Sequence, residues 1–253
     1  MRLISVRTLA VALVLGIGVV LSATQALALS GDEILQKVDD VMSAPKDRSA
    51  SVKMTLKDKS GAEKTREMKM VQKGKDKRLF TFVSPADVKG VSFLVISDDE
   101  TYLYTPAFDK IRRIASSAKN EDFMGTDFSY NDLSRNNYPI KYSAKLLKEE
   151  GNKYFLECTP KAGGDAEYGK VEMEIDKASF MPVKVTMYDK SKKLQKIMTS
   201  GTIEKIDGYW STKTLTMMDV QKNHSTSMQM IEIRHDTGVS DDEFTKRNLK
   251  KFH

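Results

Sequence analysis

Apolar and polar residues alternate with a period of two along most of the chain. Val52, Met54 and Leu56 alternate with polar residues, and residues 67–70 and 171–176 repeat this pattern. Such alternation places apolar side chains on one face of a β-sheet and charges on the face toward water. Turn residues separate the segments, so the pattern predicts roughly eleven to thirteen strands in an antiparallel sandwich or barrel. The helical segments that a doubly wound α/β fold needs between its strands do not occur.

Helical spacing of apolar residues occurs near the start of the chain. Residues 34–42 repeat apolar positions at intervals of three and four, and Pro45 ends the pattern. Ser30 and Glu33 have the spacing of a capping box, in which each side chain satisfies a free amide of the first turn. We therefore predict an amphipathic helix that rests its apolar face on the strands.

Two further segments interrupt the strand pattern. Residues 115–137 are polar but carry several large apolar side chains, and Ser129 stands three positions before Asp132, as a helix cap would. Ser240 and Glu243 have capping-box spacing, which predicts a short helix at the C-terminal end of the chain.

The first residues have the order of parts of a secretory signal peptide. Arg2 and Arg7 precede an apolar run of about thirteen residues, and Ala26 and Ala28 are small residues at the positions that signal peptidase reads. The run is shorter than the roughly twenty residues that span a bilayer as a helix. We predict that residues 1–28 are a cleaved signal peptide and that residues 29–253 form one domain in the periplasm.

The charge of the chain is mildly basic. It holds 41 Lys and Arg against 35 Asp and Glu, a formal net charge of +6 at pH 7. The lysines are scattered over alternating strand positions, which is typical of a solvated face and not of a nucleic-acid interface. We expect no nucleic-acid partner and only transient contact with anionic membranes.

Residues with catalytic or metal-binding chemistry are few and lie far apart. His224 and His235 lack a cysteine or carboxylate at metal-site spacing, and the only cysteine, Cys158, lies in an apolar strand pattern typical of a buried thiol. No nucleophile elbow, phosphate-binding loop or dinucleotide fingerprint occurs. Asp98 and Asp99 stand where a hairpin should turn. We therefore predict no enzymatic activity, no metal site and no cofactor.

Methionine is frequent in this chain, with 14 residues, most of them in strand-like segments. Three interpretations remain open. The methionines fill gaps in an ordinary core, or they line a cavity with flexible side chains that re-pack around apolar ligands. The third is Cu(I) binding by two Met-x-Met pairs, since thioethers are soft ligands. The pairs are Met68 with Met70 and Met228 with Met230.

Five segments of the chain form a recognisable series. They are residues 82–85 (FVSP), 88–91 (VKGV), 102–106 (YLYTP), 111–114 (IRRI) and 123–133 (FMGTDFSYNDL). The series resembles the LolA-like outer membrane lipoprotein-sorting protein family, in the larger form often encoded beside RND-type exporters. The resemblance spans essentially the whole chain after the predicted signal peptide, and the longest segment is its most specific part.

The resemblance implies a fold that is mainly β with a few helices, an unclosed and strongly curved antiparallel half-barrel with a helical lid over an apolar cavity. In the founding members of the family, an arginine near the cavity mouth holds the closed state, and no local motif selects Arg66 or Arg78 for that role. We expect the lid to be the 115–137 segment, through Phe123, Met124, Phe128 and Tyr130. We expect the cavity lining to come from early strands, at Met54, Met68, Met70, Phe80, Phe82 and Phe93.

The function that the resemblance implies is that of a periplasmic carrier. Such a protein binds the acyl chains of lipoproteins or other lipids and shuttles them toward the outer membrane, with an inner-membrane RND-type exporter as a possible partner. The alternative is a periplasmic sensor or scaffolding module that binds a partner protein or an envelope transporter. Neither function needs catalysis.

Overall fold

The structure is a computed structural model that describes residues 28–134, 138–163 and 165–251. The predicted signal peptide therefore lies, apart from Ala28, outside the described residues. None of the helices in the described ranges has both the length and the apolar character needed to cross a membrane. The helices are α1 (Gly31–Met42), α2 (Tyr130–Leu133) and α3 (Tyr138–Lys141), with 3-10 helices η1 (Pro106–Phe108), η2 (Ser116–Ala118), η3 (Phe123–Gly125), η4 (Asp241–Phe244) and η5 (Asn248–Lys250).

Strands make up most of the described chain. They are β1 (Asp47–Lys57), β2 (Glu63–Lys73), β3 (Lys77–Ser84), β4 (Ser92–Val95), β5 (Thr101–Thr105), β6 (Lys110–Arg113), β7 (Tyr142–Glu150), β8 (Lys153–Pro160), β9 (Lys170–Asp176), β10 (Pro182–Tyr188), β11 (Leu194–Ser200), β12 (Ile203–Ile206), β13 (Tyr209–Thr212), β14 (Thr214–Asp219) and β15 (His224–His235).

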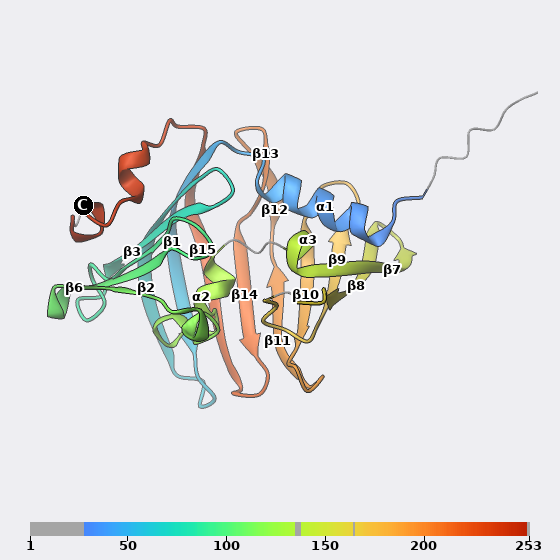
Figure 1. The fold of residues 1–253 in the computed structure, drawn as a ribbon, viewed down its shortest axis with the longest axis horizontal. Helices are drawn as coiled ribbons and strands as arrows, with labels where there is room; N and C mark the ends of the chain where they lie inside the picture. Colours follow the sequence, from blue (N-terminus) through green and yellow to red (C-terminus); the bar gives the residue numbers. More distant parts are fainter. Residues whose placement is uncertain (1–27, 135–137, 164, 252–253) are drawn as a thin grey trace, which may run out of the picture.

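Thirteen of the strands in the described ranges form a single antiparallel sheet. Its order is β6-β5-β4-β3-β2-β1-β15-β14-β11-β10-β9-β8-β7, and β12 pairs with β13 in a separate ribbon. The sheet curves strongly without closing, as Figure 1 shows, so β6 and β7 remain as its two edges. The sandwich or barrel that strand alternation alone predicts is therefore wrong, and the half-barrel that the resemblance implies is confirmed.

The predicted N-terminal helix is confirmed, and it lies across the strands at one side of the sheet (Figure 1). The Ser30 hydroxyl accepts a hydrogen bond from the Glu33 amide, and the Glu33 carboxylate accepts one from the Ser30 amide. At the helix start, a Cβ on Gly31 would lie 2.4 Å from the carbonyl oxygen of Ala144 on β7. Glycine is required there because α1 and β7 approach so closely. Burial of Ile34, Leu35 and Val38 then fixes α1 on the concave face.

Strands β3 and β4 are apolar on both faces, because both faces are covered. Phe80 and Phe93 join the main core on the concave face. Their chain neighbours Leu79 and Leu94 point to the opposite face and pack with Phe244 of η4. The C-terminal segment thus supplies a second, smaller core on the outside of the sheet.

The C-terminal segment differs from the prediction of a short capped helix. It forms the two 3-10 helices η4 and η5 instead. The Ser240 hydroxyl accepts a hydrogen bond from the amide of Asp242 at 3.2 Å, one position earlier than a capping box requires. The Glu243 carboxylate meanwhile accepts a hydrogen bond of 2.9 Å from the side-chain amide of Asn248. The side chain that would have completed the box is therefore engaged with η5.

Candidate functional site

The segment predicted to be a lid lies on the concave face of the sheet. Its described part contains η2, η3 and α2, and Figure 1 places α2 over the middle of the sheet. The capping box of α2 is formed: the Asp132 amide donates to the Ser129 hydroxyl, and the Ser129 amide donates to the Asp132 carboxylate. Because this helix is a single turn, its position depends on contacts with the sheet.

Aromatic side chains fix the first half of this segment to early strands. Phe123 is fully buried, and its ring centroid lies 5.6 Å from that of Phe82 and 5.5 Å from that of Phe93. Tyr130 adds an edge-on contact to Phe123 at 5.5 Å. Ring separations of this size are those of favourable aromatic pairs. The four rings therefore form one packed cluster between the segment and the sheet.

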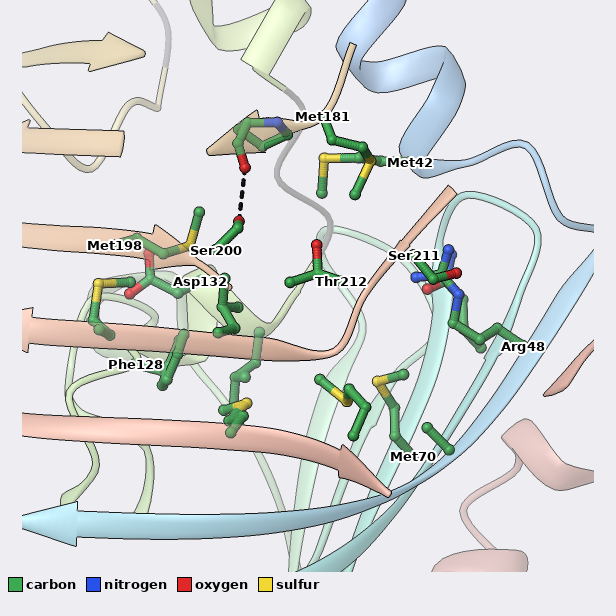
Figure 2. Close-up of a pocket in the computed structure, with 18 of the residues that line it drawn as sticks. Met42, Arg48, Met70, Phe128, Asp132, Met181, Met198, Ser200, Ser211 and Thr212 are labelled. Atoms are coloured by element: carbon green, nitrogen blue, oxygen red, sulfur yellow. Dashed lines mark hydrogen bonds between the residues drawn. The ribbon is translucent and has the colours of Figure 1, made fainter. Parts of the chain in front are cut away.

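Beside this cluster, the concave face holds a cavity of about 190 Å³, roughly ten times the space that one water molecule needs. Figure 2 shows methionine side chains from several strands and from α1 converging on it. The lining is mostly apolar and includes eight methionines. These are Met42, Met70, Met181, Met187, Met198, Met217, Met228 and Met230, with Phe80, Phe128, Leu133, Tyr138, Trp210, Leu215 and Ile233 among the other apolar lining residues.

The residues expected to line a cavity divide into two groups. Met70 and Phe80 lie in the cavity wall. The other four, which are Met54, Met68, Phe82 and Phe93, pack in the main core with at most 1% of their surface exposed. Phe82 and Phe93 belong to the aromatic cluster, which fills the concave face at that point. The open space lies instead between residues of β1 to β3 and residues of β10, β11 and β13 to β15.

The four side chains expected on the lid also take different positions. Phe123 and Tyr130 are buried in the aromatic cluster. Phe128 is 2% exposed and lies in the cavity wall, while Met124 is only partly buried against the core. Phe128 alone of the four therefore stands between the segment and the cavity.

Several cavity residues escape sequence reasoning. Met42 and Met181 come from the ends of a helix and a turn, and Trp210 and Arg48 come from segments without a distinctive pattern. The frequency of methionine in the strands does predict part of the cavity wall, because Met187 and five other strand methionines line the cavity.

Arg66 and Arg78 both hold the segment through its backbone. The Arg66 guanidinium donates to the carbonyl oxygen of Met124 at 2.7 Å, and that of Arg78 donates to the carbonyl of Leu133 at 3.3 Å and to that of Ser134. Charge-assisted hydrogen bonds of this kind are among the stronger ones in proteins. One arginine therefore contacts the segment near η3 and the other near the end of α2.

A buried aspartate attaches the same segment to β15. The Asp127 carboxylate, 2% exposed, lies 2.7 Å from Nδ1 of His224 and accepts a hydrogen bond of 2.6 Å from the Thr226 hydroxyl. The Asp127 amide also donates to that hydroxyl at 3.0 Å. The sequence gives His224 no partner at close spacing, since Asp127 comes from a distant part of the chain. His224, which has no partner nearby in the sequence, therefore has a structural role in holding the segment to β15.

A third attachment is a network of buried charges. The Glu167 carboxylate accepts hydrogen bonds from the Ser129 hydroxyl at 3.1 Å and the Asn131 side chain at 3.0 Å. Nearby, Nζ of Lys196 lies 3.3 Å from the Asp132 carboxylate, and the Lys196 side chain is only 2% exposed. Burial, and second the charge of Asp132, raise the pKa of Glu167 to about 7. Glu167 therefore titrates near neutral pH at the base of α2.

The raised pKa of Glu167 predicts a stability that falls as pH rises. Its pKa is about 7 in the folded protein against a usual value of 4.5, so the folded state binds the proton more tightly than the unfolded state does. The free energy of unfolding should then be largest below about pH 4.5 and decline until about pH 7. Glu167→Gln keeps a hydrogen-bond acceptor but cannot ionise, so it should remove this part of the decline. Denaturant titrations over that pH range measure it.

The matched control for this prediction is Glu232→Gln, because Glu232 is exposed on β15. It should keep the pH dependence of the unchanged protein. A Glu167→Gln protein whose stability follows the same pH curve as the unchanged protein would rule out Glu167 as the titrating group.

Metal-ligating groups and the thiol were two chemistries that the sequence left to check. Among the described residues, no three His, Cys, Asp or Glu side chains are placed to hold a metal ion. The Cys158 thiol is fully buried on β8, and burial raises its pKa to about 12. A thiol with so high a pKa is a packing residue and not a nucleophile.

Fold and cavity together define an open, curved antiparallel sheet with an apolar cavity on its concave face, beneath short helices. Comparison with solved structures identifies the same architecture in other bacterial proteins. A domain described as an outer membrane lipoprotein-sorting protein domain, from Vibrio parahaemolyticus, is 33% identical, with 87% of this chain and 98% of that chain covered and a TM-score of 0.79. The chain belongs to the LolA-like outer membrane lipoprotein-sorting protein family.

Two further solved structures share the fold. A DUF1329 family protein from Desulfovibrio piger is 29% identical, with 87% of this chain and 97% of that chain covered and a TM-score of 0.81. A LolA superfamily protein from Nitrosomonas europaea is 20% identical, with 87% of this chain and 100% of that chain covered and a TM-score of 0.72. A family model described as an uncharacterized protein matches residues 74–251. Among curated proteins, none matches the chain.

Proposed function

We propose that this protein is a periplasmic carrier that binds the acyl chains of lipoproteins or other lipids and moves them toward the outer membrane. The observation that carries the proposal is the methionine-lined cavity on the concave face of the open sheet. Kinship with a lipoprotein-sorting protein domain supports it. The resemblance to forms encoded beside RND-type exporters makes such an exporter the partner class to test.

The chemistry of the cavity suits a flexible hydrocarbon chain. Each buried CH₂ group contributes about 0.8 kcal/mol to transfer from water, so even a short acyl chain is held firmly. Methionine side chains have several rotatable bonds and re-pack around ligands of varied shape. Such a wall selects for apolar character more than for one exact chain.

Occlusion of the cavity tests the carrier proposal. Leu215→Trp places an indole in the cavity wall on β14 and should abolish binding of a dansyl-labelled fatty acid. The matched control is Met218→Trp, since Met218 is 39% exposed on the same strand and lies outside the cavity lining. Native mass spectrometry of protein purified from its own cell envelope provides a second measurement. Protein that copurifies with no lipid and binds no labelled fatty acid would refute the proposal.

Release of a bound chain requires the 115–134 segment to move, because Phe128 stands in the cavity wall. Arg66→Met and Arg78→Met each remove charge-assisted bonds to this segment. Each should speed transfer of a fluorescent fatty acid to vesicles by roughly tenfold or more, the effect of losing one such bond. Arg234→Met removes an exposed cation from β15 and is the control. If both variants transfer lipid at the unchanged rate, these bonds do not hold the segment closed.

We further propose that the protein reaches the periplasm through cleavage after Ala28, with a mature N-terminus at Leu29. The small residues at Ala26 and Ala28 support this site. Intact mass of the protein from the periplasmic fraction is expected to match residues 29–253. A mass that includes residues 1–28 would contradict it.

A further inference from the structure

One end of the cavity carries a cation that the carrier proposal does not use. Arg48 lies on β1 and lines the cavity. Figure 2 shows Arg48 and Ser211 at one end of the cavity, and Met198, Phe128 and Asp132 at the other. The Asp132 carboxylate is paired with Nζ of Lys196 at 3.3 Å. The cavity therefore has a cationic end, and an opposite end that is apolar apart from this paired carboxylate.

The charge of Arg48 is not balanced by a carboxylate of the described residues. Its one hydrogen bond among them runs from Nε to Nε2 of His235 at 3.2 Å. Because Nε of a guanidinium is always a donor, Nε2 of His235 acts as the acceptor, and the imidazole is neutral. Burial lowers the pKa of the Arg48 guanidinium, yet an arginine stays charged in proteins.

The position of Arg48 in the sheet concentrates positive charge at that end. Arg48 pairs with Gln72 on β2, and Gln72 pairs with Arg78 on β3. Residues directly opposite in antiparallel strands share a face, so the two arginines and the amide lie in one row, and all three line the cavity. On the other side of Arg48, the row ends at the buried side chain of His235, which pairs with Arg48 from β15.

A half-buried cation without a carboxylate partner is costly unless an anion reaches it. A guanidinium whose Nε is occupied by His235 still presents its terminal nitrogens, which bind carboxylate and phosphate oxygens well. The Ser211 hydroxyl, beside it in Figure 2, donates to the Tyr209 carbonyl at 3.4 Å and lies 3.3 Å from Nε2 of His235, so the guanidinium supplies the donors for such an oxygen. From Arg48 to Phe128, the cavity thus offers an oxyanion site followed by a hydrocarbon site.

We propose that the cavity takes an amphiphile with an anionic head, whose oxyanion binds Arg48 while its acyl chain extends toward Met198 and Phe128. This inference rests on the proposed carrier function and narrows its ligand class. A fatty-acid carboxylate and a phosphate monoester of a lysolipid share the required chemistry.

The test compares lipids that differ only in head charge. Laurate is compared with lauryl alcohol, and lauroyl lysophosphatidate with monolaurin, by displacement of a fluorescent probe from the unchanged protein. At least one charged lipid should bind about tenfold or more tightly than its uncharged counterpart, the effect expected of a charge-assisted hydrogen bond. The pair with the larger difference identifies the head as carboxylate or phosphate.

Variants assign the preference to Arg48. Arg48→Met should bind charged and uncharged lipids with equal affinity, and Arg48→Lys should keep part of the difference in affinity. The control is Arg234→Met, which removes the same charge from the exposed side of β15 and should keep the whole difference. Thermal unfolding checks that each variant is folded. The lipid comparison on the unchanged protein needs no variant, so it decides the question even if Arg48→Met does not fold.

The outcomes separate the two proposals. Equal binding of charged and uncharged lipids would overturn the head-group inference and leave the carrier function standing. A preference that persists in Arg48→Met would place the head elsewhere and overturn the inference as well. Failure of all four lipids to bind would overturn the carrier function itself.

Discussion

Replacement of Phe123 by Ala is expected to lower the free energy of unfolding by about 3–5 kcal/mol, as for other fully buried phenylalanines. Phe123 stands at the centre of the aromatic cluster, in contact with Phe82, Phe93 and Tyr130. Its removal leaves a cavity that the surrounding strands cannot fill without moving. Chemical denaturation monitored by circular dichroism gives the measurement.

The control for Phe123→Ala is Phe108→Ala, because Phe108 is 79% exposed on η1. It removes the same side chain, and its effect should lie within about 0.5 kcal/mol of zero. A loss below about 1 kcal/mol for Phe123→Ala, well under the range for buried phenylalanines, would mean that the segment is not part of the core. Because so large a loss would blur any effect on lipid binding, and Phe128 is also only 2% exposed, Arg66→Met and Arg78→Met are the better variants for studying the proposed release.

The second large effect is expected for Lys196→Met. The substitution keeps the buried hydrocarbon stem but removes the ammonium group that lies 3.3 Å from the Asp132 carboxylate. Asp132 then remains buried beside Glu167 without a cation, and removal of one partner of a buried ion pair costs about 3–5 kcal/mol. The Lys196 charge also lowers the pKa of Glu167, so that pKa should rise further in the variant. The loss should therefore be larger at pH 8 than at pH 5.

The matched control for this prediction is Lys184→Met on the neighbouring strand β10. Lys184 pairs with Glu174 at 3.7 Å, and its side chain is 44% exposed. An exposed pair contributes about 0–1 kcal/mol, so this variant should unfold almost as the unchanged protein does. Equal losses for the two lysines would mean that the Lys196 pair behaves as a surface pair.

Local features of the fold follow from the sequence because they depend on neighbouring residues. The capping boxes at Ser30 and Ser129 form as their spacing predicts, and Asp98 and Asp99 lie in the turn between β4 and β5. The openness of the sheet does not follow, because alternation shows only that one face is buried and not what covers it. Pairing of β1 with β15 joins residues nearly two hundred positions apart, which no local pattern encodes.

The site could be predicted only in part for a related reason. Alternation places Met68 and Met70 on the same face, yet Met68 is in the core and Met70 lines the cavity. What separates them is the position of Phe123 and Phe128 above the sheet, which depends on the contacts of Arg66 and Asp127. Those contacts link segments far apart in the chain. The sequence therefore predicts that methionines line the cavity, but not which of them lie in its wall and which lie in the core.

The eight methionines that surround the cavity make its polarity dependent on oxidation. A thioether converted to a sulfoxide becomes polar and chiral, and several such groups would turn an apolar wall into one that hydrogen-bonds water. Met70 and Met230 are only partly buried, so oxidants reach them before the fully buried Met217 and Met228. An occupied cavity shields the same sulfurs. Bound hydrocarbon would therefore protect the wall that holds it, and the protein with an empty cavity would be the form whose wall oxidants alter.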